Sequence, residues 1–102
     1  MRTIYKYPLE LTATQTIKMH VGANVLTAQL QNGIITLWVD CQPENKKEDR
    51  TFWIFGTGTG IPVRYLDYIS TIQLLDYVWH IYEELPEETM DLDWPDSGGD
   101  LG

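Results

Sequence analysis

A glycine-rich loop with an arginine on each side is the stretch whose residue types could bind a ligand. The string RTFWIFGTGTGIPVR spans residues 50–64 and places three alternating glycines between a strand-like run and Ile61-Pro62. Alternating glycines allow backbone angles that other residues avoid, and successive backbone N–H groups can cradle a phosphate. The arginines would supply positive charge. The candidate ligand residues are Arg50, Gly56, Thr57, Gly58, Thr59, Gly60 and Arg64.

The loop lacks the features of a P-loop. No Lys-Ser or Lys-Thr pair follows the glycines, and Ile61-Pro62 opens no obvious helix that would face a phosphate. The glycines are also consistent with a flexible connection between two strands, in which they satisfy backbone geometry alone. The sequence leaves both interpretations open.

The negative charge is confined to one end of the chain. Residues 1–82 contain seven acidic and seven basic side chains, whereas residues 83–102 contain eight acidic side chains and no basic one. The whole net charge of −8 therefore belongs to the second segment. We interpret the chain as a nearly neutral domain, residues 1–84, with a net charge of −2, followed by an acidic tail, residues 85–102.

The tail has the composition of a segment that cannot bury enough surface to order itself alone. Within it, Met90, Leu92 and Trp94 alternate with aspartates, a pattern that could dock on a partner as an extended strand. Its carboxylates would replace phosphates on a partner's Arg and Lys side chains. The candidate partner-binding residues are Glu83, Glu84, Glu87, Glu88, Asp91, Asp93, Trp94 and Asp96.

The remaining residues with chemical potential do not form a catalytic or metal site. His20 and His80 are the natural general bases near neutral pH, but nothing frames a nucleophile beside either of them. Two histidines and the single Cys41, without paired short spacings, do not describe a zinc site. We expect no enzyme activity, metal or cofactor, and we expect His80 to be a strand residue with a hydrogen-bonded ring.

The first two thirds of the chain predict strands. Residues 16–21, 25–31 and 34–40 alternate apolar and polar side chains, and Asn32-Gly33 between the last two predicts a type I′ hairpin turn. Residues 3–7 and 51–55 predict two further strands. The polar stretch QPENKKED, residues 42–49, predicts a solvated loop. We expect Trp38, Trp53 and Trp79 to build the core.

The segment from Tyr65 to Tyr82 is ambiguous. Its apolar residues fit a helical stripe, yet its β-branched and aromatic residues are equally consistent with two strands, roughly 68–74 and 77–82. Residue types favour the strands. The sequence therefore predicts an all-β or β-dominated domain of about seven strands, a small sandwich or open barrel with an acidic C-terminal arm.

The cysteine count, the length of the apolar runs and the N-terminal residues indicate the cellular compartment. A single cysteine allows no internal disulfide, and no apolar run approaches the length of a membrane span. The first ten residues contain no apolar core of a signal peptide. We expect a cytoplasmic protein.

A series of motifs runs in order through residues 3–84. They are TIYKYPLE at 3–10, QNG at 31–33, LW at 37–38, RTFWIFGTG at 50–58, IP at 61–62, YISTIQL at 68–74 and VWHIYEE at 78–84. These motifs resemble a family of small, uncharacterised bacteriophage proteins, a domain of unknown function. Family members carry His-Pro where this chain has Thr59-Gly60, so a role for that histidine does not transfer. They also end near Glu84, which would make the tail an extension.

The resemblance implies a phage-encoded accessory protein that acts in the host bacterial cytoplasm. Together with the acidic tail, it leads to the hypothesis of a non-enzymatic, anti-CRISPR-like inhibitor that binds a basic nucleic-acid-binding surface of a host defence complex. The alternative is an oligomer that sequesters a nucleotide immune signal through the loop Gly56–Gly60. Neither hypothesis involves direct nucleic-acid binding or a membrane. An enzyme is the third and least supported hypothesis.

Overall fold

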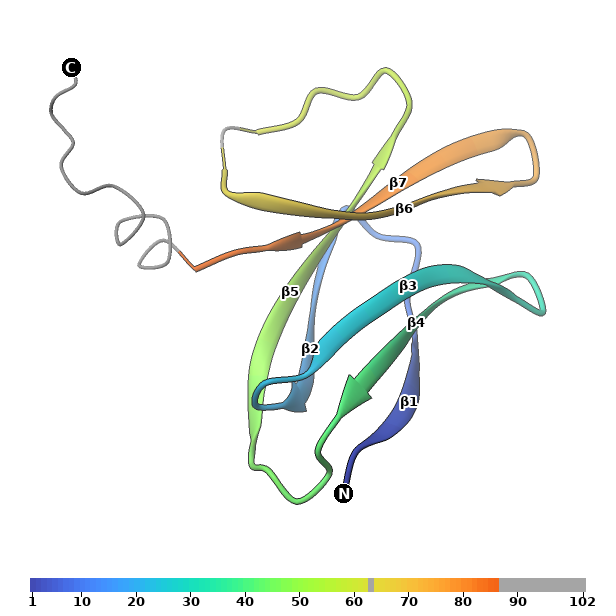
Figure 1. Cartoon of the computed structure of the whole chain (residues 1–102). Coiled ribbons are helices and arrows are strands. Elements are labelled where there is room, and N and C mark those ends of the chain that lie inside the picture. The colour runs from blue at the N-terminus through green and yellow to red at the C-terminus, as the bar shows by residue number, and fades with distance from the viewer. Residues whose placement is uncertain (63, 87–102) are drawn as a thin grey trace, which may run out of the picture.

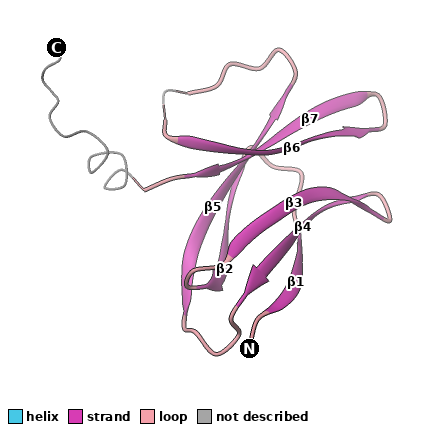
Figure 2. Ribbon diagram, viewed as in Figure 1, coloured by secondary structure: helices cyan, strands magenta, loops and turns pink. Residues whose placement is uncertain are grey.

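The computed structural model describes residues 1–62 and 64–86, and this part of the chain is built from strands. Figures 1 and 2 show two antiparallel sheets that face each other. The expectation of an all-β fold with seven strands is confirmed. The strands are β1 (Thr3–Pro8), β2 (Thr14–His20), β3 (Asn24–Gln31), β4 (Ile34–Cys41), β5 (Lys47–Gly56), β6 (Leu66–Leu74) and β7 (Tyr77–Glu84).

The core lies between a three-stranded sheet, in the order β1-β4-β3, and a four-stranded sheet, in the order β2-β5-β7-β6. Because side chains alternate along a strand, each sheet contributes every second residue to the core. The largest fully buried side chains come from both sheets: Met19, Leu37, Val39, Phe52 and Ile81. Apolar burial of this kind supplies the main driving force for folding.

The turn at Asn32-Gly33 is confirmed. Both residues have positive φ, 51° and 77°, and the flanking Gln31 and Ile34 are paired directly across the hairpin. This is the type I′ geometry, whose twist matches that of the adjoining strands.

The ambiguous segment forms two strands rather than a helix. β6 and β7 pair in an antiparallel hairpin, and Leu74 lies opposite Tyr77 across a two-residue turn. Residue-type preference was therefore a better guide here than helical spacing, because β-branched and aromatic side chains pack well on a pleated surface.

The polar stretch 42–49 is only partly a loop. β5 begins at Lys47, so the prediction of a solvated connection is wrong for its last three residues. These residues pair with the end of β2, where Lys18 donates to Asp49 over 2.7 Å from the opposite strand. Cross-strand charge pairs allow a strand to continue through polar sequence when its side chains face solvent.

Two of the three tryptophans lie outside the core. Trp38 alternates with the buried Leu37 and Val39, and Trp53 alternates in the same way between Phe52 and Ile54, so both occupy outer faces. Only Trp79 packs against the core cluster. The sequence expectation was wrong for Trp38 and Trp53. It considered only the residue type and not which face of the strand each tryptophan occupies.

The two sheets meet along a seam between β3 and β6, which run side by side in the same direction (Figure 1). Each strand has a register irregularity here, at Leu26 in β3 and at Ile69 in β6. No backbone ladder joins the two strands. Instead, the Ala28 backbone N–H donates to the Ser70 hydroxyl over 2.9 Å. The fold is thus a sandwich with one side closed.

The described residues contain no helix that could cross a membrane.

Candidate acidic binding site

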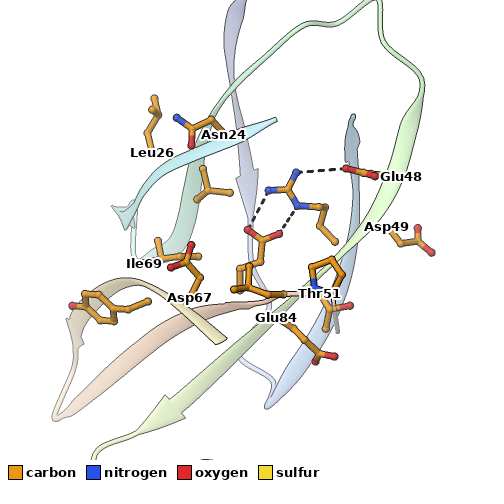
Figure 3. A pocket seen from close by; sticks show the side chains of 14 residues that line it. Asn24, Leu26, Glu48, Asp49, Thr51, Asp67, Ile69 and Glu84 are labelled. Carbon is orange, nitrogen blue, oxygen red and sulfur yellow. Dashed lines mark hydrogen bonds and ion pairs between the residues drawn. The ribbon is translucent and has the colours of Figure 1, made fainter. Parts of the chain in front are cut away.

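A cavity of about 560 Å³ opens at one end of the four-stranded sheet. It is lined by residues of β3, β5, β6 and β7 and by Leu85-Pro86, where the chain leaves the last strand. Figure 3 shows Leu26 and Ile69, the two positions of strand irregularity, together with acidic side chains around the same space. The bulges that form the seam therefore also form one wall of the cavity.

Carboxylates dominate the lining. Nine acidic residues lie in residues 1–86, and five of them line this cavity: Glu48, Asp49, Asp67, Glu83 and Glu84. One basic residue, Arg50, accompanies them. The five acids come from three strands: one pair of sequence neighbours from β5, one pair from β7, and Asp67 from β6. The lining therefore has four more acidic than basic residues, and two of its acids have cations from outside the lining: Lys18 lies 2.7 Å from Asp49, and Arg64 lies 4.0 Å from Glu84.

Arg50 is bound by other residues of the domain. Its Nη2 donates to Glu83 Oε1 over 3.1 Å, and its Nε donates to Glu83 Oε2. Its Nη1 donates to the Ala23 carbonyl over 3.1 Å. The same nitrogen lies 3.9 Å from Glu48 Oε2, the contact drawn as a dashed line to Glu48 in Figure 3. The hydrogen bonds that Arg50 donates to Glu83 raise the pKa of Arg50, and burial opposes that shift. The guanidinium is therefore a fixed part of the floor.

Chemically, such a site suits an organic cation. A guanidinium or ammonium group can donate hydrogen bonds to the carboxylates, while its aliphatic stem packs on apolar walls. Among the described residues, no group of three or more His, Cys, Asp or Glu side chains is arranged to hold a metal ion.

The glycine loop forms a defined turn. The Thr59 N–H donates to the Gly56 carbonyl over 3.0 Å, and Gly58 has a φ of +91° at the third position. This is the pattern of a type II turn, which needs glycine at that position. The Thr57 N–H donates to the Val78 carbonyl over 3.2 Å, so at least two N–H groups of the loop are bound within the protein.

Gly56 is not crowded by its neighbours. A Cβ at Gly56 would lie 3.4 Å from Trp79 Cζ3 and 3.5 Å from the Thr59 hydroxyl oxygen, which is ordinary van der Waals contact, and its φ is not positive. The turn geometry therefore explains one of the three glycines, Gly58.

The structure does not gather the candidate ligand residues into one site. Arg50 lies six residues before Gly56 on the same strand, which corresponds to about 20 Å of extended chain. Arg64 lies with its guanidinium carbon 5.4 Å from the Trp53 ring centroid and its Nη1 4.0 Å from Glu84 Oε2. The Trp53 ring nitrogen donates to Glu84 Oε1 over 2.7 Å.

Of the acidic residues predicted to bind a partner, Glu83 and Glu84 lie in the cavity wall. The others lie outside the described residues: Glu87, Glu88, Asp91, Asp93, Trp94 and Asp96. The domain contributes Glu48, Asp49 and Asp67 to the same end, and sequence reasoning missed these three. No local signal marks them, because strand pairing alone brings residues 48 and 67 near residue 83.

Comparison with protein families matches residues 1–91 of the chain to a domain of unknown function, DUF7352. The chain belongs to the DUF7352 family. No curated protein and no solved structure shows significant similarity to the chain. The expected resemblance to a family without known function is confirmed, and the DUF7352 match continues to residue 91, past Glu84, where the resemblance was expected to end.

In this DUF7352 chain, His80 is a strand residue with a hydrogen-bonded ring, as predicted. Its Nε2 is 2.8 Å from the Thr57 hydroxyl and its Nδ1 is 3.1 Å from the Thr71 hydroxyl, which in turn lies 2.7 Å from the Tyr68 hydroxyl. The imidazole thus connects the glycine loop to β6.

Proposed function

We propose that this protein is a non-enzymatic inhibitor, carried by a bacteriophage, that docks its acidic end on a basic nucleic-acid-binding surface of a host defence complex. One observation carries the proposal: five of the nine acidic residues in residues 1–86 meet around one cavity, at the point where the chain continues into six more. In the sequence, the acidic tail follows directly after the last residues that line this cavity, which supports a combined role for the two.

Rigid carboxylates suit this role better than mobile ones. Glu48 and Asp67 are carried by paired strands, so little conformational entropy is lost when they meet a partner. A concentrated negative field also accelerates the encounter with a basic surface and aligns the partners. The apolar walls at Leu26 and Ile69 would pack against the stems of Arg or Lys side chains.

The experiment compares phage plating on a host with an active nucleic-acid-guided defence. Expression of the full chain should raise plating efficiency by orders of magnitude. A variant with Glu48→Gln and Asp67→Asn should lose most of this protection. A control with Glu10→Gln and Glu44→Gln removes the same charge outside the cavity and should protect fully. The proposal fails if both variants are folded by circular dichroism and protect equally well.

The alternative hypothesis, sequestration of a nucleotide by the loop, requires Arg50 and the loop to face one ligand. Their separation along β5 does not favour that arrangement. A nucleotide that raises the melting temperature of the full chain would support sequestration over docking.

A further inference from the structure

The turn between β6 and β7 carries a leucine where backbone geometry calls for glycine. Of its two central residues, only the first has positive φ: Leu75, at 59°. A hairpin with positive φ at the first central position alone corresponds to a type II′ turn, which normally takes glycine there. Leu75 is also 89% exposed, so burial within the domain does not explain its side chain. Observed strain of this kind is a reason to look for function.

The turn exposes two large, mainly apolar side chains and one carboxylate. Tyr77 is 65% exposed, and Asp76 lies between these two residues at the tip. We call residues 75–77 the tip. In Figure 1 the tip projects beyond the body of the sheet at the β6–β7 turn.

A groove with complementary chemistry lies along β1. It has a volume of about 540 Å³ and apolar or aromatic walls from Ile4, Tyr5, Tyr7 and Trp38. Lys6 and Lys47 also line it, and no acidic residue does. In a chain of net charge −8, a basic, aromatic groove is a local exception. We call this surface the β1 groove.

We propose that the tip of one copy of this chain docks in the β1 groove of another copy. Leu75 and Tyr77 would pack on the aromatic floor, and Asp76 would pair with Lys6 or Lys47. Apolar contact and charge complementarity then act at the same place.

The contact must form between molecules. In Figure 1 the β3–β4 hairpin separates the tip from β1, so the two surfaces cannot meet within one chain. A contact between two different surfaces is head-to-tail, and it generates a ring if the rotation closes or a filament if it does not. The tip and the β1 groove share no lining residue with the acidic cavity, so the inference does not depend on the proposed function.

Sedimentation velocity of the full chain over a series of concentrations tests the association. The weight-average mass should rise with concentration. Leu75→Gly should weaken association about tenfold or more, as expected for an anchor residue. It should also raise the thermal midpoint, because glycine accepts positive φ without strain. Leu11→Ala is the matched control: Leu11 is exposed, lies outside both surfaces, and its loss should leave association unchanged.

Charge exchange tests the pairing of tip and groove. Two variants are studied separately first: the tip variant Asp76→Lys, and the groove variant that combines Lys6→Glu with Lys47→Glu. Each should be monomeric by itself, because its tip and its groove then carry charge of the same sign. An equimolar mixture should associate again, because each tip finds a groove of opposite sign. Lys46→Glu, which alters an exposed neighbour that does not line the groove, should associate like the unmodified chain. The inference is overturned if the unmodified chain stays monomeric, if Leu75→Gly associates normally, or if the mixture stays monomeric.

Discussion

Arg50 donates to both carboxylate oxygens of Glu83 from the neighbouring strand, and these side chains are only 17% and 12% exposed. The same guanidinium donates to the Ala23 carbonyl in the turn before β3. One cation therefore ties β5, β7 and the link to the other sheet, and it fixes a carboxylate in the floor of the acidic site.

Removal of one partner of this pair should be costly. Arg50→Ala should lower the free energy of unfolding by about 3 kcal/mol, because it leaves Glu83 buried without its counter-charge. Urea unfolding measures the change. Lys18→Ala provides the control: its pair with Asp49 is 71% and 62% exposed, so its loss should cost at most about 1 kcal/mol. Equal losses for the two variants would contradict a special role for Arg50.

Gly33→Val should destabilise the domain by more than about 1 kcal/mol, because a β-branched residue is disfavoured at positive φ. The measurement is the thermal midpoint together with urea unfolding. Asn32→Gly should be well tolerated, since glycine adopts the φ of 51° at that position without strain. An unchanged midpoint for Gly33→Val would argue against the type I′ turn.

The glycine loop should show different tolerance at two of its glycines. Gly58 has positive φ, so Gly58→Ala should cost about 1 kcal/mol of stability. Gly60 lacks positive φ and has no neighbour within 4 Å of a Cβ, so Gly60→Ala should be neutral or slightly stabilising. At a phosphate site, both substitutions would also abolish ligand binding.

The ion pair between Arg2 and Asp40 predicts an acid-dependent contribution to stability. The hydrogen bond from Arg2 lowers the pKa of Asp40 below its usual value of about 4. A carboxyl with a depressed pKa in the folded state stabilises the protein above that usual value, and the contribution is lost as pH falls through the folded pKa. The urea midpoint should therefore drop less between pH 7 and pH 3 in Asp40→Asn than in the unmodified chain. An identical drop would show that the pair contributes nothing.

The arm should matter for binding and little for folding. Truncation after Pro86 leaves seven basic and nine acidic residues, a net charge of −2 in place of −8, and keeps the Leu85 N–H that donates to the Tyr65 carbonyl. The truncated domain should unfold cooperatively near the midpoint of the full chain. Its binding to the host complex should weaken strongly, and binding of the full chain should fall with rising salt.

Trp94→Ala should weaken the same binding, since aromatic anchors dominate many interfaces. If the truncated domain binds and protects as well as the full chain, acidic mimicry by the arm is excluded.

Local sequence patterns predicted most strands but little of the candidate site. The turn at Asn32-Gly33 has a chemical signature, which fixes the register of residues 27–31 against 34–38, whereas the irregularity at Leu26 has no such signature. The turn at Leu75 has none, because leucine breaks the preference that would mark it. Arg50 and Glu83 are 33 positions apart in the sequence. They meet in space because β5 and β7 become neighbours in the sheet. Patterns with a period of two reveal faces of strands, whereas a site shared by three strands depends on which strands become neighbours.

The contact at Ser70 also determines how easily the two sheets can separate along the seam. The bond from Ala28 to Ser70 links positions 42 residues apart, and no ladder between β3 and β6 needs to break for the sheets to part there. Opening along this line would cost less than global unfolding, so amide hydrogen exchange at Ala28 should be faster than at the ladder amides of β5. Since Leu26 and Ile69 stand on opposite sides of the same line, each such opening would also widen the acidic cavity.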